Sequence, residues 1–172
     1  MNKKKTTLYL LRGVIAVLLV LHLCTIFHFS AEAAPQSDRT STSLIETLLK
    51  TVSPSFSSLS PDRQAQKVQS LQKIVRTLAH FAEFCYLGAL LCALLLTFRL
   101  RQKGLLCGFF GCVLTAAGDE MHQLLIPGRT FQWADIAVDS AGAALGMAAM
   151  GLVVYLAVRI IKKTKQKRGT AI

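Results

Sequence analysis

Carboxylates occur in this sequence where a membrane-spanning segment normally has none. Five of the nine acidic residues lie inside or at the ends of strongly apolar stretches; these are Glu83, Asp119, Glu120, Asp135 and Asp139. An ionised carboxylate is costly in hydrocarbon, so such residues usually face a protein interior or a water-filled site. Carboxylates at such a site exchange protons or bind amines, hydroxyl groups and cations. We therefore expect a functional polar site at the membrane.

Basic and amide side chains accompany these acids at helical spacing. Arg76, His80 and Glu83 are separated by four and three residues, so they share one face of a helix. The predicted ligand-binding residues are Arg76, His80, Glu83, Asp119, Glu120, His122, Gln123, Arg129, Asp135 and Asp139. The candidate catalytic residues are the possible acids and bases Glu83, Asp119 and Glu120, with His122 as a proton shuttle.

The charge of this set restricts its state. With both histidines neutral, the five carboxylates exceed Arg76 and Arg129 by three negative charges, which a partly desolvated site resists. Protonated histidines, neutral carboxylic acids or a bound cation would each relieve the excess. No ligand spacing is diagnostic of a metal, so we predict neither a metal nor a cofactor. Each residue taken alone also has a structural explanation: Arg76 and Arg129 can be charges at the membrane interface, and Asp135 can cap a helix.

Four apolar runs are long enough to position these residues as helices across a bilayer. Each has at least the roughly 20 residues that a spanning helix needs; the runs cover about 8–29, 78–98, 104–126 and 131–158. The chain has 172 residues, of which 52% are hydrophobic. We predict an all-α integral membrane four-helix bundle, a single domain over 1–172, with an outer loop over about 30–77.

Basic residues at the ends of the runs predict the orientation. Thirteen of them, and no acidic residue, lie before or at the start of the first run, between the second and third, and after the fourth; they are Lys3, Lys4, Lys5, Arg12, Arg99, Arg101, Lys103, Arg159, Lys162, Lys163, Lys165, Lys167 and Arg168. Such residues are retained in the cytoplasm, so both termini are predicted to be cytoplasmic and the acids to lie at the outer leaflet. The net charge of +11 then favours anionic lipid over nucleic acid as a partner. A cleaved signal peptide is the alternative for the first run.

Two helices are expected within the outer loop. Ser43 and Glu46 have capping-box spacing, which predicts that a short amphipathic helix starts there and lies on the membrane surface. Ser60, Pro61 and Asp62 are typical of a helix start, and this helix can continue into the second run. The loop fits either a solvated connector or a lid over the site.

Small residues mark one face of each of the last two runs. The third has glycines at spacings of four and three, and the fourth has Gly142 and Gly146 in line with Asp135 and Asp139. Small residues let membrane helices approach closely. We therefore predict that the third and fourth runs pack tightly against each other. The five cysteines all fall within the runs without a CxxC pair, and we expect them to pack as small apolar residues.

Several short motifs together resemble the VanZ-like family of small membrane proteins. In chain order they are Phe27–Ser30, His80–Phe84, Asp119 and Glu120 with Gln123, Pro127–Arg129, and Asp135, Asp139 and Gly142. The resemblance implies a protein of the bacterial cytoplasmic membrane with a role in the cell envelope, in a family named after a teicoplanin-resistance accessory protein. One departure is Ala31 and Glu32, where Ser and Gln are expected, which weakens any role for that turn.

Three functions fit these residues, since a family does not fix an activity. The leading hypothesis is an outer-leaflet pocket that binds an envelope lipid or lipid-linked precursor and so lowers susceptibility to teicoplanin and other lipoglycopeptides. Its arginines would contact phosphate or carboxylate groups, and its acids amines or sugar hydroxyls. The alternatives are a membrane-embedded enzyme acting on such a lipid by acid-base chemistry, and a proton-coupled transporter, which would require a homodimer. A purely structural role in assembly also fits.

Overall fold

The computed structural model describes residues 3–98 and 102–169 and is helical throughout its regular parts. The elements are α1 (Lys3–Ser30), α2 (Ala34–Val52), the 3₁₀ turn η1 (Pro54–Phe56), α3 (Pro61–Thr97), α4 (Gln102–Gln123) and α5 (Trp133–Gly169). The described ranges contain no strand. The helices α1, α3, α4 and α5 are long and apolar enough to cross a membrane. The prediction of an all-α chain with four apolar spans is confirmed; Arg99 and Arg101 lie outside the described residues.

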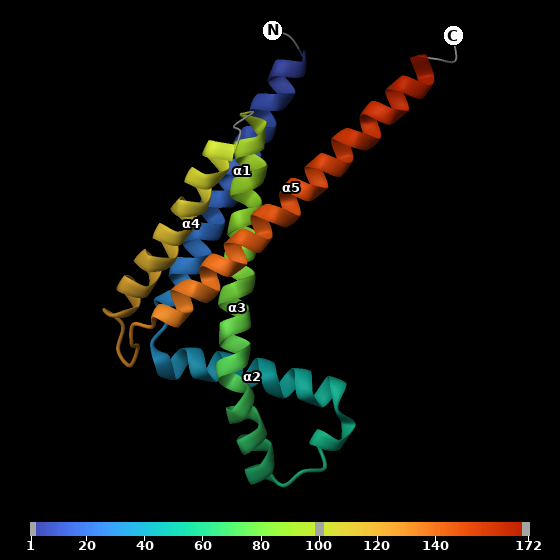
Figure 1. Cartoon of the computed structure of the whole chain (residues 1–172). Helices are drawn as coiled ribbons and strands as arrows, with labels where there is room; N and C mark the ends of the chain where they lie inside the picture. The colour runs from blue at the N-terminus through green and yellow to red at the C-terminus, as the bar shows by residue number, and fades with distance from the viewer. Residues whose placement is uncertain (1–2, 99–101, 170–172) are drawn as a thin grey trace.

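The long helix α3 forms the centre of the molecule and contacts every other α-helix (Figure 1). The helices α1 and α4 run beside it, whereas α5 crosses it obliquely. The helix α2 lies across one end of the bundle, and the start of α3 extends beyond it. The start of α1 and the end of α5 both lie at the opposite end of the molecule, apart from each other. The connection between α4 and α5 is therefore at the same end as α2.

The crossing of α3 and α5 depends on glycines. A Cβ atom added to Gly142 or Gly146 of α5 would overlap the backbone carbonyls of Phe81 and Cys85 on α3. The helices α4 and α5 do pack against each other, but the prediction that their small residues form this contact is wrong, because the α5 glycines face α3. Gly111 of α4 has no neighbouring heavy atom within 4 Å of such a Cβ. Spacing identifies a face of small residues, but it does not identify the helix that packs on it.

Two apolar cores hold the helices together. The larger contains Ile26, Phe84, Cys112 and Ala143, which join α1, α3, α4 and α5. The smaller contains Ile45, Phe56 and Val68, which fasten α2 and η1 to the start of α3. The segment between α1 and the second span is therefore packed and mostly helical.

The starts of the two helices in this segment test the capping signals. The helix α3 begins at Pro61 and continues to Thr97, so its predicted start and its continuation into the second span are confirmed. The predicted capping box in α2 is wrong, because α2 begins at Ala34 and Ser43 lies inside it, where its carbonyl accepts a hydrogen bond from Thr47. The sequence Ala34–Pro35 supplies the actual start, with proline in the first turn.

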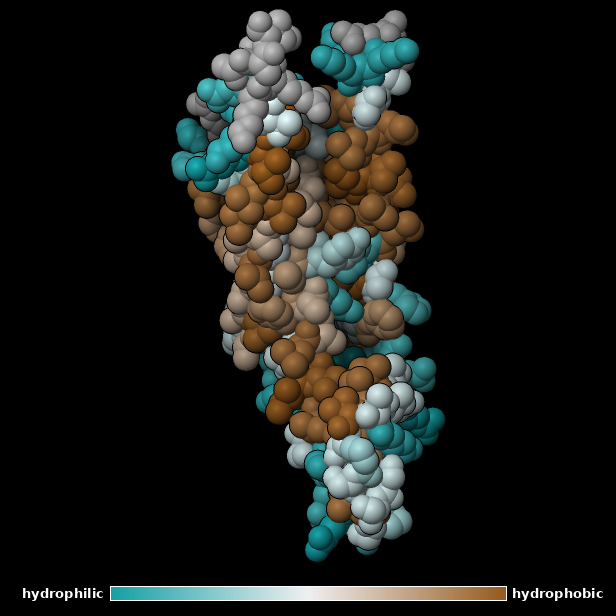
Figure 2. All heavy atoms as spheres, turned by 90° about the vertical axis from the view of Figure 1, so that its right-hand side faces the viewer, coloured by the Kyte–Doolittle hydropathy of each residue, from teal (hydrophilic) through white to brown (hydrophobic). Residues whose placement is uncertain are grey.

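The surface divides into apolar and polar zones. Figure 2 shows apolar side chains over the spans on one face, polar side chains at both ends, and a polar indentation below the middle. Leu44, Leu48 and Val52 of α2 are also exposed, with 52%, 51% and 79% of their surfaces accessible. An exposed apolar stripe on a helix that lies across a bundle of spans fits a helix at a membrane surface.

Candidate functional site

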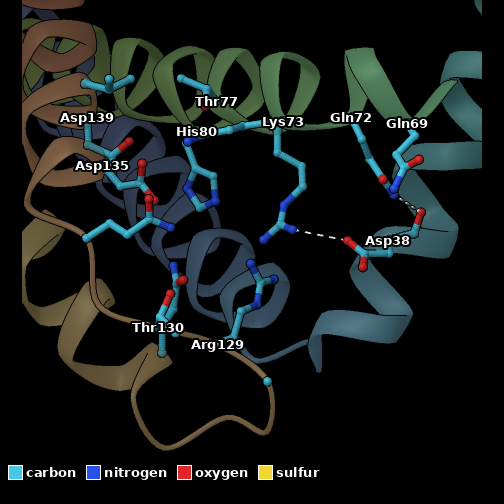
Figure 3. A pocket seen from close by; sticks show the side chains of 15 residues that line it. Asp38, Gln69, Gln72, Lys73, Thr77, His80, Arg129, Thr130, Asp135 and Asp139 are labelled. Carbon is cyan, nitrogen blue, oxygen red and sulfur yellow. Dashed lines mark hydrogen bonds and ion pairs between the residues drawn. The ribbon is translucent and has the colours of Figure 1, made fainter. Parts of the chain in front are cut away.

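A hollow of about 350 Å³ opens where α3, the start of α5, the connection 124–132 and α2 come together (Figure 3). Its lining is almost entirely polar and consists of Asp38, Gln69, Gln72, Lys73, Arg76, Thr77, His80, Gln123, Gly128, Arg129, Thr130, Gln132, Asp135, Val138 and Asp139. We call it the polar pocket. Six of the ten predicted ligand-binding residues line it.

The acidic end of the polar pocket is formed by α5. Asp135 and Asp139 are one helical turn apart, and both point toward His80 in Figure 3. Asp139 is only 1% exposed, and neither of its carboxylate oxygens has a hydrogen-bond partner among the described residues. An unpaired buried carboxylate is costly, so Asp139 requires a proton or a positively charged neighbour.

Two further carboxylates lie behind this end on α4, and both are buried. Asp119 accepts a hydrogen bond from Gln123 Nε2 through Oδ2 at 3.1 Å, while its Oδ1 has no partner within the described ranges. Glu120 accepts one from the backbone N–H of Gln132 at 2.9 Å, which fastens the end of α4 to the start of α5. Asp139 lies within electrostatic range of all four other carboxylates of the predicted cluster. The structure thus brings the five acids together.

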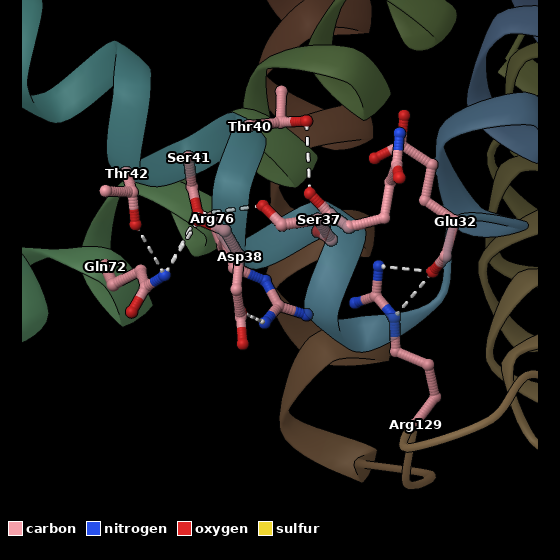
Figure 4. A network of polar contacts seen from close by, with 10 residues as sticks. Glu32, Ser37, Asp38, Thr40, Ser41, Thr42, Gln72, Arg76 and Arg129 are labelled. Carbon is pink, nitrogen blue, oxygen red and sulfur yellow. Dashed lines mark hydrogen bonds and ion pairs between the residues drawn. The ribbon is translucent and has the colours of Figure 1, made fainter.

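The opposite end of the polar pocket is basic. Arg76 Nη1 lies 3.2 Å from Asp38 Oδ1, an ion pair between α3 and α2. Arg129 donates from Nε and Nη2 to the backbone carbonyl of Glu32, both at 3.3 Å (Figure 4). Burial lowers the pKa of Arg129, and the neighbouring Arg76 guanidinium lowers it further. A bound anion would offset that cost.

A tight turn places Arg129. Its N–H donates to the carbonyl of Ile126 at 3.2 Å, and Gly128 between them has a φ of 79°. Proline followed by a residue with positive φ is the pattern of a type II turn, so Gly128 is needed here. The turn directs the arginine toward the end of α1.

The histidines divide between the site and the scaffold. His80 lies between the acidic and basic ends of the polar pocket, and its Nδ1 is buried without a partner in the described part of the chain. His122 instead packs edge-on against Phe27 of α1 and lines neither hollow. His22 lies 2.8 Å from the carbonyl of Glu83 through Nε2, which fits the structural role expected for it. His122 is therefore less well placed than His80 to shuttle protons.

A second hollow of about 240 Å³ adjoins the polar pocket. We call it the apolar groove because Phe29, Leu44, Val75 and Ala79 contribute much of its lining. Arg76, His80 and Arg129 line both hollows, so they form the shared wall. Glu83 lines the groove and not the pocket.

The site lies within a region of known sequence relationship. The family model described as VanZ/LLP1 matches residues 14–157, which include every predicted site residue. The chain belongs to the VanZ/LLP1 family. With its four apolar helices, this VanZ-like chain is a multi-pass membrane protein. No curated protein and no solved structure matches it.

Sequence reasoning on this VanZ-like protein missed several residues that line the polar pocket. Asp38, Gln72 and Lys73 lie in the segment assigned to an outer loop, and Gln72 Nε2 donates to the Asp38 carbonyl at 3.0 Å. The helical phase of α3 was the available signal, because Gln72 and Lys73 precede Arg76 by four and three residues. No sequence signal pairs Asp38 with Arg76.

The turn after α1 also differs from expectation. Glu32 departs from the expected family pattern, yet its backbone carbonyl accepts both hydrogen bonds from Arg129. Any residue type supplies that carbonyl, so the departure does not remove the contact. Among the residues that the structure describes, no group of three His, Cys, Asp or Glu side chains has the geometry to hold a metal ion.

Proposed function

We propose that this VanZ-like protein binds the headgroup of an envelope lipid or lipid-linked precursor at the outer leaflet of the bacterial cytoplasmic membrane. Bound in this way, the lipid would be less accessible to teicoplanin and related lipoglycopeptides, which would lower susceptibility. The observation that carries the proposal is the polar pocket and the apolar groove side by side, with Arg76, His80 and Arg129 as their shared wall. A lipid has the same two parts, a polar headgroup and an apolar chain.

The basic end of the polar pocket supports the binding of an anion. Arg76, Arg129 and Lys73 bring three positive charges to this end, against the single carboxylate of Asp38. Arginine presents a planar set of donors that matches phosphate and carboxylate geometry. A phosphate there would replace the solvent that the partly buried Arg129 has lost.

The apolar groove supports the binding of a chain. Phe29 of α1 and Leu44 of α2 line the groove and are exposed. Leu48 and Val52 continue the apolar stripe of α2. If this stripe rests on the bilayer surface, a lipid can place its chain in the groove without leaving the membrane.

The proposed orientation follows from the basic residues. Positive charge is retained on the cytoplasmic side, and the described basic residues at the ends of α1 and α5 lie at the end of the bundle opposite the pocket. Both termini are then cytoplasmic, and the two hollows face outward. Glycopeptide antibiotics act on that side of the membrane.

Ligand-induced stabilisation of the purified full chain tests the proposal. Undecaprenyl phosphate and phosphatidylglycerol are added separately in detergent, and the unfolding temperature is measured. We expect stabilisation by at least one of them, and Arg129→Ala to abolish it. Arg63→Ala, an exposed arginine of α3 that lines neither hollow, is the matched control. The proposal is contradicted if neither of these lipids nor phosphatidylethanolamine stabilises the protein, or if Arg129→Ala and Arg63→Ala are stabilised equally.

A cellular measurement tests the link to antibiotics. Cells expressing the wild type should be less susceptible to teicoplanin than cells expressing Arg129→Ala, at equal protein levels. Binding without any difference in susceptibility would retain the lipid site and reject the resistance role.

An enzyme acting on the same lipid is the second candidate. The favouring observation is that Asp139 and His80, both in the polar pocket, have buried atoms without hydrogen-bond partners in the described structure. Such groups can accept and release protons from a bound substrate. Mass spectrometry of membrane lipids distinguishes the two, because an enzyme changes the lipid profile and Asp139→Asn restores the original one. An unchanged profile on wild-type expression rejects the enzyme.

A further inference from the structure

The polar pocket is electrostatically divided, which restricts what kind of headgroup fits it. Asp135 and Asp139 lie at one end, Arg129 lies at the other, and His80 lies between them (Figure 3). The positive charges of Arg76 and Arg129 are already directed to Asp38 and to the Glu32 carbonyl. The acidic end therefore has no cation of its own within hydrogen-bonding reach among the described residues.

The acidic end also has unused acceptors. Both oxygens of Asp139 are buried without a partner in the described ranges, and Asp135, one turn nearer the helix start, is partly exposed to the pocket. A primary ammonium carries three donors and one positive charge, so it can satisfy acceptors and offset charge together. A hydroxyl group provides one donor and no charge. An amine thus fits this end better than a sugar hydroxyl.

The lining argues against a quaternary ammonium group. Such groups have no N–H donor, and proteins recognise them with cages of aromatic side chains. None of the described residues that line the polar pocket is Phe, Tyr or Trp. A choline headgroup would leave the Asp139 oxygens without donors.

We propose that the acidic end of the pocket selects a primary amine, so that the ligand is a lipid headgroup carrying both a phosphate and a primary amine. This inference rests on the proposed function and specifies its ligand class. The phosphate lies against Arg129 and Arg76, and the ammonium is held by Asp135 above the buried Asp139. The pocket thereby selects headgroups whose negative and positive groups are separated in the same way as its basic and acidic ends.

Lipids of matched acyl chains test this selection. Affinities of the purified full chain are measured for phosphatidylethanolamine, phosphatidylcholine, phosphatidylglycerol and phosphatidic acid. We expect phosphatidylethanolamine to bind about 10- to 100-fold more tightly than the other three, which is the scale of a charge-assisted hydrogen bond. This comparison uses the wild-type protein, so it does not depend on any variant folding.

Two variants assign the preference to the acidic end. Asp135→Asn should remove the preference for phosphatidylethanolamine over phosphatidylglycerol, whereas Asp62→Asn, an exposed acid outside the pocket, should leave that preference unchanged. Equal affinity for phosphatidylethanolamine and phosphatidylcholine, or a preference that survives Asp135→Asn, overturns the amine inference alone. If none of the four lipids nor undecaprenyl phosphate binds, the proposed function fails as well.

Discussion

Replacing Gly146 with alanine tests the contact on which the site is built. Gly146 of α5 faces the backbone of α3 so closely that an added Cβ would overlap the carbonyl of Cys85 and contact the backbone N of Ala89. These are backbone atoms, so no side-chain rotation can relieve the overlap. The two helices must move apart or α5 must rotate. Gly151, five residues later in α5, has no heavy atom within 4 Å of its added Cβ and provides the matched control.

The two variants should differ clearly in stability. At Gly151 the alanine adds only its better helix propensity, which is worth up to about 1 kcal/mol. At Gly146 the same gain is opposed by overpacking, which costs about 1–3 kcal/mol and more where only backbone can yield. Because both variants share the propensity gain, their free energies of unfolding should differ by the overpacking cost alone, about 1–3 kcal/mol or more. For a chain of this size the unfolding temperatures should differ on the order of 2–12 °C.

Thermal unfolding of both variants in the same detergent measures this difference. Lipid binding is measured in parallel, because a shift of α5 against α3 also separates Asp139 from His80. We expect Gly146→Ala to lose stability and affinity, and Gly151→Ala to retain both. If Gly146→Ala is as stable as Gly151→Ala, α5 does not cross α3 at this point, and the polar pocket described here is not formed.

Three further predictions concern other parts of the molecule. Without ligand and at a pH high enough to ionise Asp139, Asp139→Asn should raise the free energy of unfolding by about 1 kcal/mol, because it removes a buried charge without a partner; a lower unfolding temperature of the variant at that pH would contradict this. Arg12→Ala should cost about 1–3 kcal/mol, since Arg12 donates to Thr97 Oγ1 and to the Thr97 carbonyl, whereas an unaffected unfolding temperature would refute this contact. Reporter fusions to the C-terminus should be active only in the cytoplasm, and an externally active fusion would reverse the proposed orientation.

The membrane spans were predictable because they are decided by the apolar character of a continuous run of residues. A helix that crosses hydrocarbon must be apolar over about 20 residues, and this requirement is local in sequence. The continuation of α3 from Pro61 into the second span was predictable for a similar reason, since its start signal and apolar phase are also local. The grouping of the acids near one end followed from the positions of the spans and their loops.

The partners of each helix face were not predictable in the same way. The glycines of α4 and α5 have equivalent spacing, yet only those of α5 meet a neighbouring backbone, which belongs to α3. The ion pair between Asp38 and Arg76 joins residues 38 positions apart, and its formation depends on where α2 packs. Both are products of three-dimensional packing that no local pattern records.

The close contact of α3 with α5 and the charge of the site are linked by their position in sequence. Gly142, about one helical turn after Asp139 in α5, lies against the carbonyl of Phe81. Phe81 directly follows His80 in α3. A close backbone contact between α5 and α3 therefore lies next to the acidic end and fixes its carboxylates on rigid backbone. Arg129, in contrast, is placed by a turn and held by a backbone carbonyl. The rigid acidic end suits a ligand whose positive group has one fixed position, whereas the basic end can accept a negative group in more than one position. We therefore expect the pocket to discriminate more strictly among amine groups than among the phosphate-bearing parts of its ligands.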